Sequence, residues 1–128
     1  MKYVPILFRI AFWFPLAICT YLALRSGPYP EAIRFPDVVL HVFAFAYLTV
    51  ALVLAHFDTD RNPRSVAFKM LWIPMAWMFF YSVALELAQT FTIDRQAEML
   101  DVLWGTIGIG LGQTLYWGYV RLCVNPTN

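Results

Sequence analysis

Side chains that could do acid–base chemistry lie in three places of an otherwise apolar chain. Asp37 and His41 are four residues apart, so on a helix they would share one face. Glu86 and Gln89 form a second pair at helical spacing, and Asp101 opens a later apolar segment. An imidazole near carboxylates can work as a general base or as a nucleophile. We therefore assign a candidate catalytic role to His41, Asp37, Glu86 and Asp101.

Arg95 is the candidate for holding an anionic group. It lies in the polar stretch between Gln89 and Asp101. Its planar guanidinium presents forked N–H donors that match a phosphate or carboxylate oxygen. We expect Arg95 and Gln89 to bind substrate. We expect Glu86 and Asp101 to share protons or to hold a divalent cation, and we expect no other cofactor.

These residues must be positioned by helices that cross a membrane. Of the 128 residues, 61% are hydrophobic and 13% are charged, whereas about a quarter of the residues in soluble domains are charged. Four apolar stretches, at about 4–24, 37–55, 68–90 and 99–124, are each near the roughly 20 residues that cross a bilayer as a helix. The sequence thus predicts one all-α domain over residues 1–128, a bundle of four transmembrane helices.

The distribution of basic residues predicts the orientation of this bundle, because Lys and Arg near helix ends favour the cytoplasmic side. An N-terminus in the cytoplasm puts six basic residues inside and three outside. The inner group is Lys2, Arg9, Arg61, Arg64, Lys69 and Arg121, and the outer group is Arg25, Arg34 and Arg95. We therefore expect a multi-pass protein of the bacterial cytoplasmic membrane with both termini in the cytoplasm. Since successive helices run in opposite directions, the three polar sets would meet at the outer face.

The last apolar stretch carries a stripe of small residues. Gly105, Gly108 and Gly112 follow Asp101 on one helical face, and the last two form a GxxxG pair. Such pairs let two helices in a membrane approach backbone to backbone. We expect these three glycines to pack against a neighbouring helix, which would bury the face that carries Asp101.

The same residues match a pattern found in a known family. Asp37 and His41 precede the longer pattern E-x2-Q-x5-R-x5-D-x6-G-x3-G, which runs from Glu86 to Gly112. In this pattern, over residues 37–112, the chain resembles the VanZ-like family of small bacterial membrane proteins. The family usually has Asn four residues after the aspartate of its last helix, whereas this chain has Gly105.

This resemblance implies a place in the cell envelope. The family is named for an accessory protein of resistance to the glycopeptide antibiotic teicoplanin, and its biochemical activity is not established. The partners that the resemblance implies are membrane lipids together with a lipid-linked envelope precursor or an amphiphilic antibiotic.

Several functions fit the sequence, and it does not decide whether the protein is an enzyme. The chain could act on a lipid-linked phosphate or lipid headgroup, or bind such a headgroup or antibiotic without breaking a bond. It could also be a small transporter, or a scaffold subunit with an oligomeric or membrane-protein partner. The polar cluster could instead serve only to hold the helices together. Nucleic acid is excluded as a partner, because the net charge is +1 and the basic residues form no run.

Overall fold

The computed structural model describes residues 4–25, 36–57, 67–93 and 96–124, except for the side chains of 4, 67–70, 123 and 124. The helices are α1 (Val4–Leu24), α2 (Asp37–Leu52), α3 (Ala67–Gln89) and α4 (Met99–Tyr119), and π-helical turns η1 (Val53–Phe57) and η2 (Val120–Val124) continue α2 and α4. These described segments contain no strand, which confirms the all-α prediction. Five of the basic residues used to predict the orientation lie outside the described residues: Lys2, Arg34, Arg61, Arg64 and Arg95.

The predicted loop after the second apolar stretch begins later than expected. The second apolar stretch was expected to end at about residue 55, but the helical structure continues through Phe57. The apolar character extends to Phe57, which packs against the core. His56 is half-buried, and its Nε2 accepts a hydrogen bond of 3.2 Å from Nε1 of Trp13. This contact gives His56 a role in joining α1 to the end of α2.

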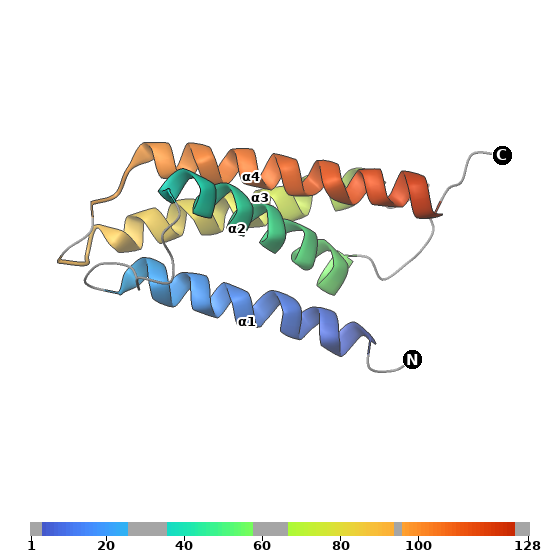
Figure 1. Cartoon of the computed structure of the whole chain (residues 1–128), viewed down its shortest axis with the longest axis horizontal. Helices are drawn as coiled ribbons and strands as arrows, with labels where there is room; N and C mark the ends of the chain where they lie inside the picture. The colour runs from blue at the N-terminus through green and yellow to red at the C-terminus, as the bar shows by residue number, and fades with distance from the viewer. Residues whose placement is uncertain (1–3, 26–35, 58–66, 94–95, 125–128) are drawn as a thin grey trace.

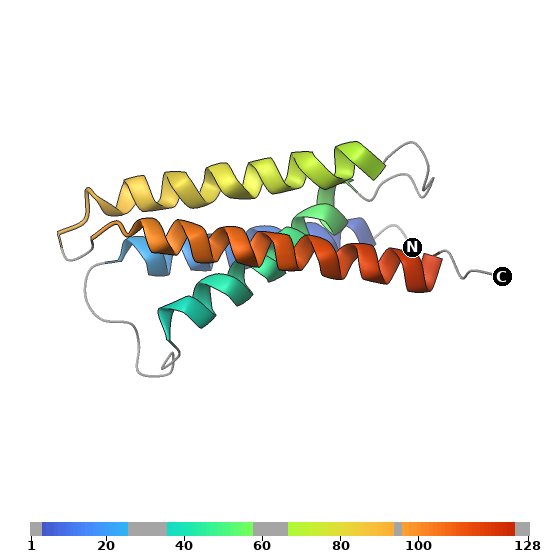
Figure 2. The same cartoon turned by 90° about the horizontal axis from the view of Figure 1, so that it is seen from above.

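The four helices form an antiparallel bundle (Figure 1). Helices α1, α3 and α4 follow the long axis of the molecule, while α2 crosses them at an incline, as Figure 2 shows from above. The start of α1 and the end of α4 lie at one end of the bundle. At the other end, α1 and α3 finish and α2 and α4 begin, so this second end holds the described polar residues Asp37, His41, Glu86, Gln89 and Asp101.

The closest helix contact is between α2 and α4. A Cβ atom added at Gly108 would meet the carbonyl oxygen of Val42 and lie 3.0 Å from its Cα. A Cβ added at Gly112 would likewise meet the carbonyl oxygen of Ala46. The two backbones therefore touch directly, as a GxxxG pair allows.

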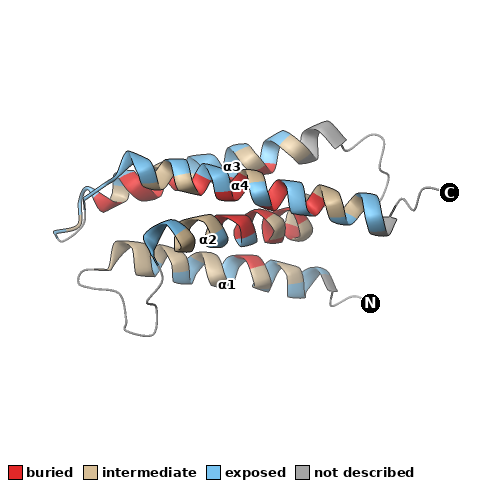
Figure 3. Cartoon of the chain, turned by 45° about the horizontal axis from the view of Figure 1, so that its top comes forward, coloured by how far each residue is buried: buried red, intermediate tan, exposed pale blue. Residues whose placement is uncertain are grey.

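Around this contact lies a small apolar core. Phe45, Leu48, Met78 and Ile109 are all almost fully buried, and they come from α2, α3 and α4. Figure 3 shows the buried residues concentrated on the facing sides of these three helices. Helix α1 contributes Phe12 to the same cluster.

Helix α1 packs along one side only, where Phe8, Phe12, Leu16 and Cys19 contact the core. Only 6% of its apolar segment is buried, against 44% of the segment formed by α2 and η1. The Thr20 and Tyr81 hydroxyls are hydrogen bonded at 2.8 Å, and the Tyr47 hydroxyl donates to the carbonyl oxygen of Ala11 at 2.7 Å. Hydrogen bonds between membrane helices contribute about 0.6 kcal/mol each on average, so α1 is held less firmly than α2 is held to α4.

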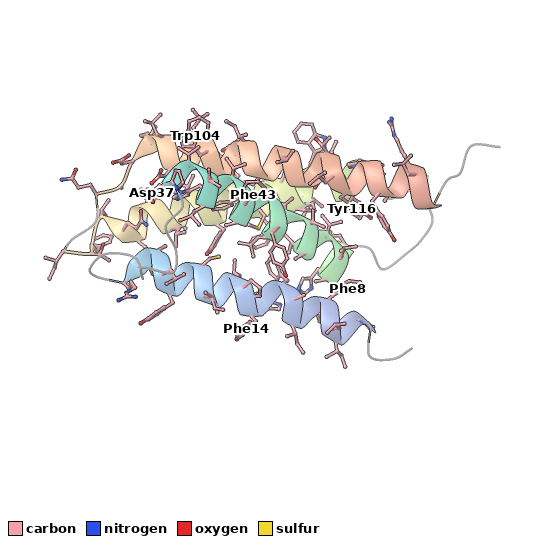
Figure 4. All side chains as sticks on the ribbon, viewed as in Figure 1. Phe8, Phe14, Asp37, Phe43, Trp104 and Tyr116 are labelled. Carbon is pink, nitrogen blue, oxygen red and sulfur yellow. The ribbon has the colours of Figure 1, made fainter. Side chains whose placement is uncertain are left out.

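The outward surface of the bundle is apolar and aromatic. Trp13, Phe14, Trp77 and Phe80 are among the many large side chains that are more than half exposed, and Figure 4 shows side chains of this kind projecting from the helices. Three helical segments of the described chain are long and apolar enough to cross a membrane: Pro5–Leu24, Asp37–Phe57 and Leu71–Gln89. Helix α4 is also 21 residues long, but Gln113 and its glycines make it less apolar. This surface is compatible with a lipid environment.

The α2–α4 contact predicts opposite effects for two glycine substitutions. Gly108→Ala should destabilise the bundle by about 1–3 kcal/mol, because the new Cβ would overlap the Val42 carbonyl oxygen. Gly110→Ala is the matched control, since a Cβ there meets nothing within 4 Å and alanine favours a helix over glycine by up to about 1 kcal/mol. Unfolding by SDS in mixed micelles, followed by circular dichroism, measures both. Equal stabilities of the two variants would contradict the close contact.

Candidate functional site

His41 is held in one orientation by its own helix. Its Nδ1 lies 2.9 Å from the backbone carbonyl oxygen of Asp37, one turn earlier in α2. A carbonyl oxygen can only accept a hydrogen bond, so Nδ1 must carry the proton of this bond. Nε2 is therefore the ring atom left to face the rest of the site. The ring also stacks on Phe45, with the centroids 6.5 Å apart and the planes 10° from parallel.

Two carboxylates from other helices meet this imidazole. Nε2 of His41 lies 3.9 Å from Oδ2 of Asp101 on α4. With Glu86 of α3 included, one potential ligand atom from each of the three side chains lies within 4.8 Å of the other two. Residues 41, 86 and 101 are far apart in the sequence, so this convergence is produced by the packing of three helices.

The three side chains of the cluster differ in their exposure. Glu86 is only 6% exposed, whereas the side chains of His41 and Asp101 are 16% and 21% exposed. A small ligand could therefore reach the imidazole and the Asp101 carboxylate, with Glu86 behind them.

Local structure explains why these three side chains meet. Asp101, Gly105 and Gly108 lie along one face of α4, and Gly108 touches α2 at Val42, the neighbour of His41. The close approach of the two backbones thus draws the first turns of α2 and α4 together. Oε2 of Glu86 accepts a hydrogen bond of 3.2 Å from the backbone N–H of Glu98, just before α4 begins, which fixes the Glu86 carboxylate relative to α4.

Three other residues of the predicted site are placed differently from this trio. The side chain of Asp37 is exposed, and the contact that it makes with His41 uses its backbone carbonyl. Gln89 is buried, and its Nε2 donates a hydrogen bond of 3.1 Å to the carbonyl oxygen of Ala23. This bond connects α3 to the end of α1. Arg95, the predicted anion clamp, lies outside the described residues.

The arrangement of donors and acceptors limits what the cluster can hold. If His41 is neutral, Nε2 carries a lone pair that faces carboxylate oxygens, which also carry lone pairs and negative charge. Such groups repel one another strongly where little water screens them. A proton on Nε2, a proton shared by the carboxylates or a bound cation removes this repulsion. Chemically, the cluster can therefore take up a proton or a cation.

Two contacts at the site involve residues not assigned to it from the sequence. Phe45 lies four residues after His41, at the spacing that stacks two rings on one helix face, so the sequence did contain a signal for it. Glu98 contacts the site through its backbone N–H. Every residue except proline has such a group, so the sequence could not have predicted this contact.

The surroundings of Gly105 explain why a larger residue is not accommodated there. Gly105 is buried, and a Cβ at this position would lie 3.0 Å from Oγ of Ser82 and 3.3 Å from the ring of Phe45. Ser82 is itself only 2% exposed. The space beside Gly105 is filled by side chains of α2 and α3.

Comparison of the chain with protein-family models, with characterised proteins and with solved structures finds no match.

Gly105→Asn should destabilise the protein by about 1–3 kcal/mol, because the added side chain would displace Ser82 and Phe45. Gly110→Asn places the same side chain on the same helix, at a position with open space around it, and should leave stability within about 0.5 kcal/mol. Thermal unfolding of both variants in detergent tests this expectation. A stable Gly105→Asn protein would mean that the pocket around residue 105 is larger than the structure indicates.

Proposed function

We propose that this chain is a multi-pass membrane protein of the bacterial cell envelope, of the VanZ-like kind, with four membrane-spanning helices and both termini in the cytoplasm. We further propose that its polar cluster acts on the phosphate-bearing headgroup of an envelope lipid at the outer face of the membrane. His41 serves as the proton-transferring group, and Asp101 and Glu86 set its charge.

One observation carries this proposal: His41, Glu86 and Asp101 come from three helices and bring their polar atoms within 4.8 Å of one another at one end of an apolar bundle. Ionisable groups within a membrane are costly, by about 2.5 to 3.5 kcal/mol each on insertion scales. A purely structural role would leave this cost poorly compensated by hydrogen bonds between helices. Partial exposure of His41 and Asp101 supports a site that receives a ligand.

A groove along α1 supports a lipid as that ligand. It has a volume of about 570 Å³, its lining is mostly apolar, and Trp13, Leu16, Thr20 and Arg25 are among the residues that line it. It extends toward Arg25, at the end of the bundle that also holds the cluster. An acyl chain fits an apolar groove of this kind, and a guanidinium at its end is suited to a headgroup phosphate.

Replacement of His41 tests the proton-transfer role. His41→Gln keeps a hydrogen-bonding side chain but cannot transfer a proton near neutral pH, so headgroup turnover should fall by about 100-fold or more. The assay uses purified protein in vesicles of bacterial phospholipid and polyprenyl phosphate, with products followed by mass spectrometry. His56→Gln is the matched control, because His56 lies at the other end of α2 in contact with Trp13, and it should keep full turnover.

Full turnover in the His41→Gln protein would refute proton transfer by His41. If neither protein turns over any lipid, but both retain the same lipid in native mass spectrometry, the site is one for binding without chemistry.

The orientation is tested by cysteine labelling. In a chain with Cys19→Ala and Cys123→Ala, Gln96→Cys should react with a membrane-impermeant maleimide added to intact spheroplasts, because residue 96 lies at the outer end in the proposed topology. Leu122→Cys is the paired probe, since Leu122 is 80% exposed at the opposite end, and it should react only after lysis. The reverse pattern would place the polar cluster at the cytoplasmic face.

A further inference from the structure

We infer that His41, Glu86 and Asp101 form a binding site for a divalent transition-metal ion of the zinc type, an inference that rests on the proposed function because it concerns the same site. The imidazole nitrogen Nε2 and one oxygen from each carboxylate are the ligands, and a fourth position is open to a headgroup oxygen.

The fixed ring of His41 is the first argument. Histidines that bind metals almost always donate their other ring N–H to a carboxylate, a water or a backbone carbonyl, which sets the tautomer and aims the free nitrogen. In this chain Nδ1 makes that bond to the Asp37 carbonyl oxygen at 2.9 Å. Nε2 is left as an electron-pair donor that points to the carboxylate of Asp101.

The charge of the cluster is the second argument. With both carboxylates ionised and the imidazole neutral, the cluster carries a charge of −2, and Glu86 is only 6% exposed. A divalent cation neutralises both carboxylates and turns the repulsion among three electron-pair donors into three bonds. It also removes the obstacle to binding an anionic headgroup beside two acidic side chains.

The distances fit a metal after a small adjustment. In a tetrahedral zinc site with bonds of roughly 2.0–2.1 Å, ligand atoms are about 3.4 Å apart. The candidate ligand atoms lie within 4.8 Å of one another, and the His41 and Asp101 atoms are 3.9 Å apart. Gaps of about 0.5 to 1.4 Å close by rotation of the Asp101 side chain and a smaller turn of the Glu86 carboxylate that keeps one oxygen on the Glu98 N–H, without moving a helix.

The donor set selects the class of metal. Mg²⁺ and Ca²⁺ prefer sites made wholly of oxygen and take six or more ligands. A nitrogen with two carboxylates suits zinc and its transition-metal neighbours. Three protein ligands with one open position are typical of zinc sites that act on a substrate, and the partly exposed side of the cluster, at His41 and Asp101, is where that position opens.

Metal binding is tested with the purified full chain, stripped with EDTA in detergent and titrated with Zn²⁺ alone by isothermal calorimetry. We expect one ion per chain, with the Kd raised by at least about tenfold in each of His41→Gln, Glu86→Gln and Asp101→Asn. The matched control is His56→Gln, which removes the imidazole that contacts Trp13 at the opposite end of the bundle, and it should bind as the wild type does. Unchanged affinity in the three ligand variants would overturn the inference.

A second measurement does not depend on how well the variants fold. Co²⁺ in place of Zn²⁺ should give the wild-type chain the intense visible absorption of a four-coordinate site, and the weak spectrum of hydrated Co²⁺ would overturn the inference.

The two proposals can fail separately. Headgroup turnover that needs His41 but proceeds in EDTA removes the metal and keeps the function, whereas specific Zn²⁺ binding without any headgroup binding keeps the metal and removes the function.

Discussion

The contact between the backbones of α2 and α4 is the constraint on which the rest of the structure depends. Gly108 and Gly112 leave no side chain between the helices, so Val42 and Ala46 lie directly against them. This approach fixes where the first turns of α2 and α4 meet, and with it the distance between the imidazole and the carboxylate that these turns carry. Larger residues at the two glycines would separate the helices, and the polar groups with them.

The polar cluster combines rigidity and a local excess of acceptor atoms. Backbone groups orient two of its members: the carbonyl of Asp37 holds His41, and the N–H of Glu98 holds Glu86. Because neither orientation depends on a mobile side chain, the electron pairs stay directed at one another. Where few waters separate such groups, a proton or a cation between them would relieve their mutual repulsion.

Sequence reasoning predicted the coarse structure well because hydropathy reports it directly. The four apolar stretches match the helices to within a few residues, and the alternating helix directions placed His41, Glu86 and Asp101 at one end, where the structure has them. Contacts set by the rotation of a helix and by side-chain torsions could not be predicted this way. Gln89 faces α1 although it is only three residues from Glu86, and the helical structure after α2 runs past the expected end at about residue 55 to Phe57.

The position of α1 has a consequence for how the bundle tolerates a disturbance. Helices α2, α3 and α4 supply most of the buried core, and α4 lies against α2 through its glycines. Helix α1 packs along one side, with Phe12 in the core and hydrogen bonds to α2 and α3. A shift of α1 would therefore break contacts at this side while the backbone contact that brings His41 and Asp101 together stays intact.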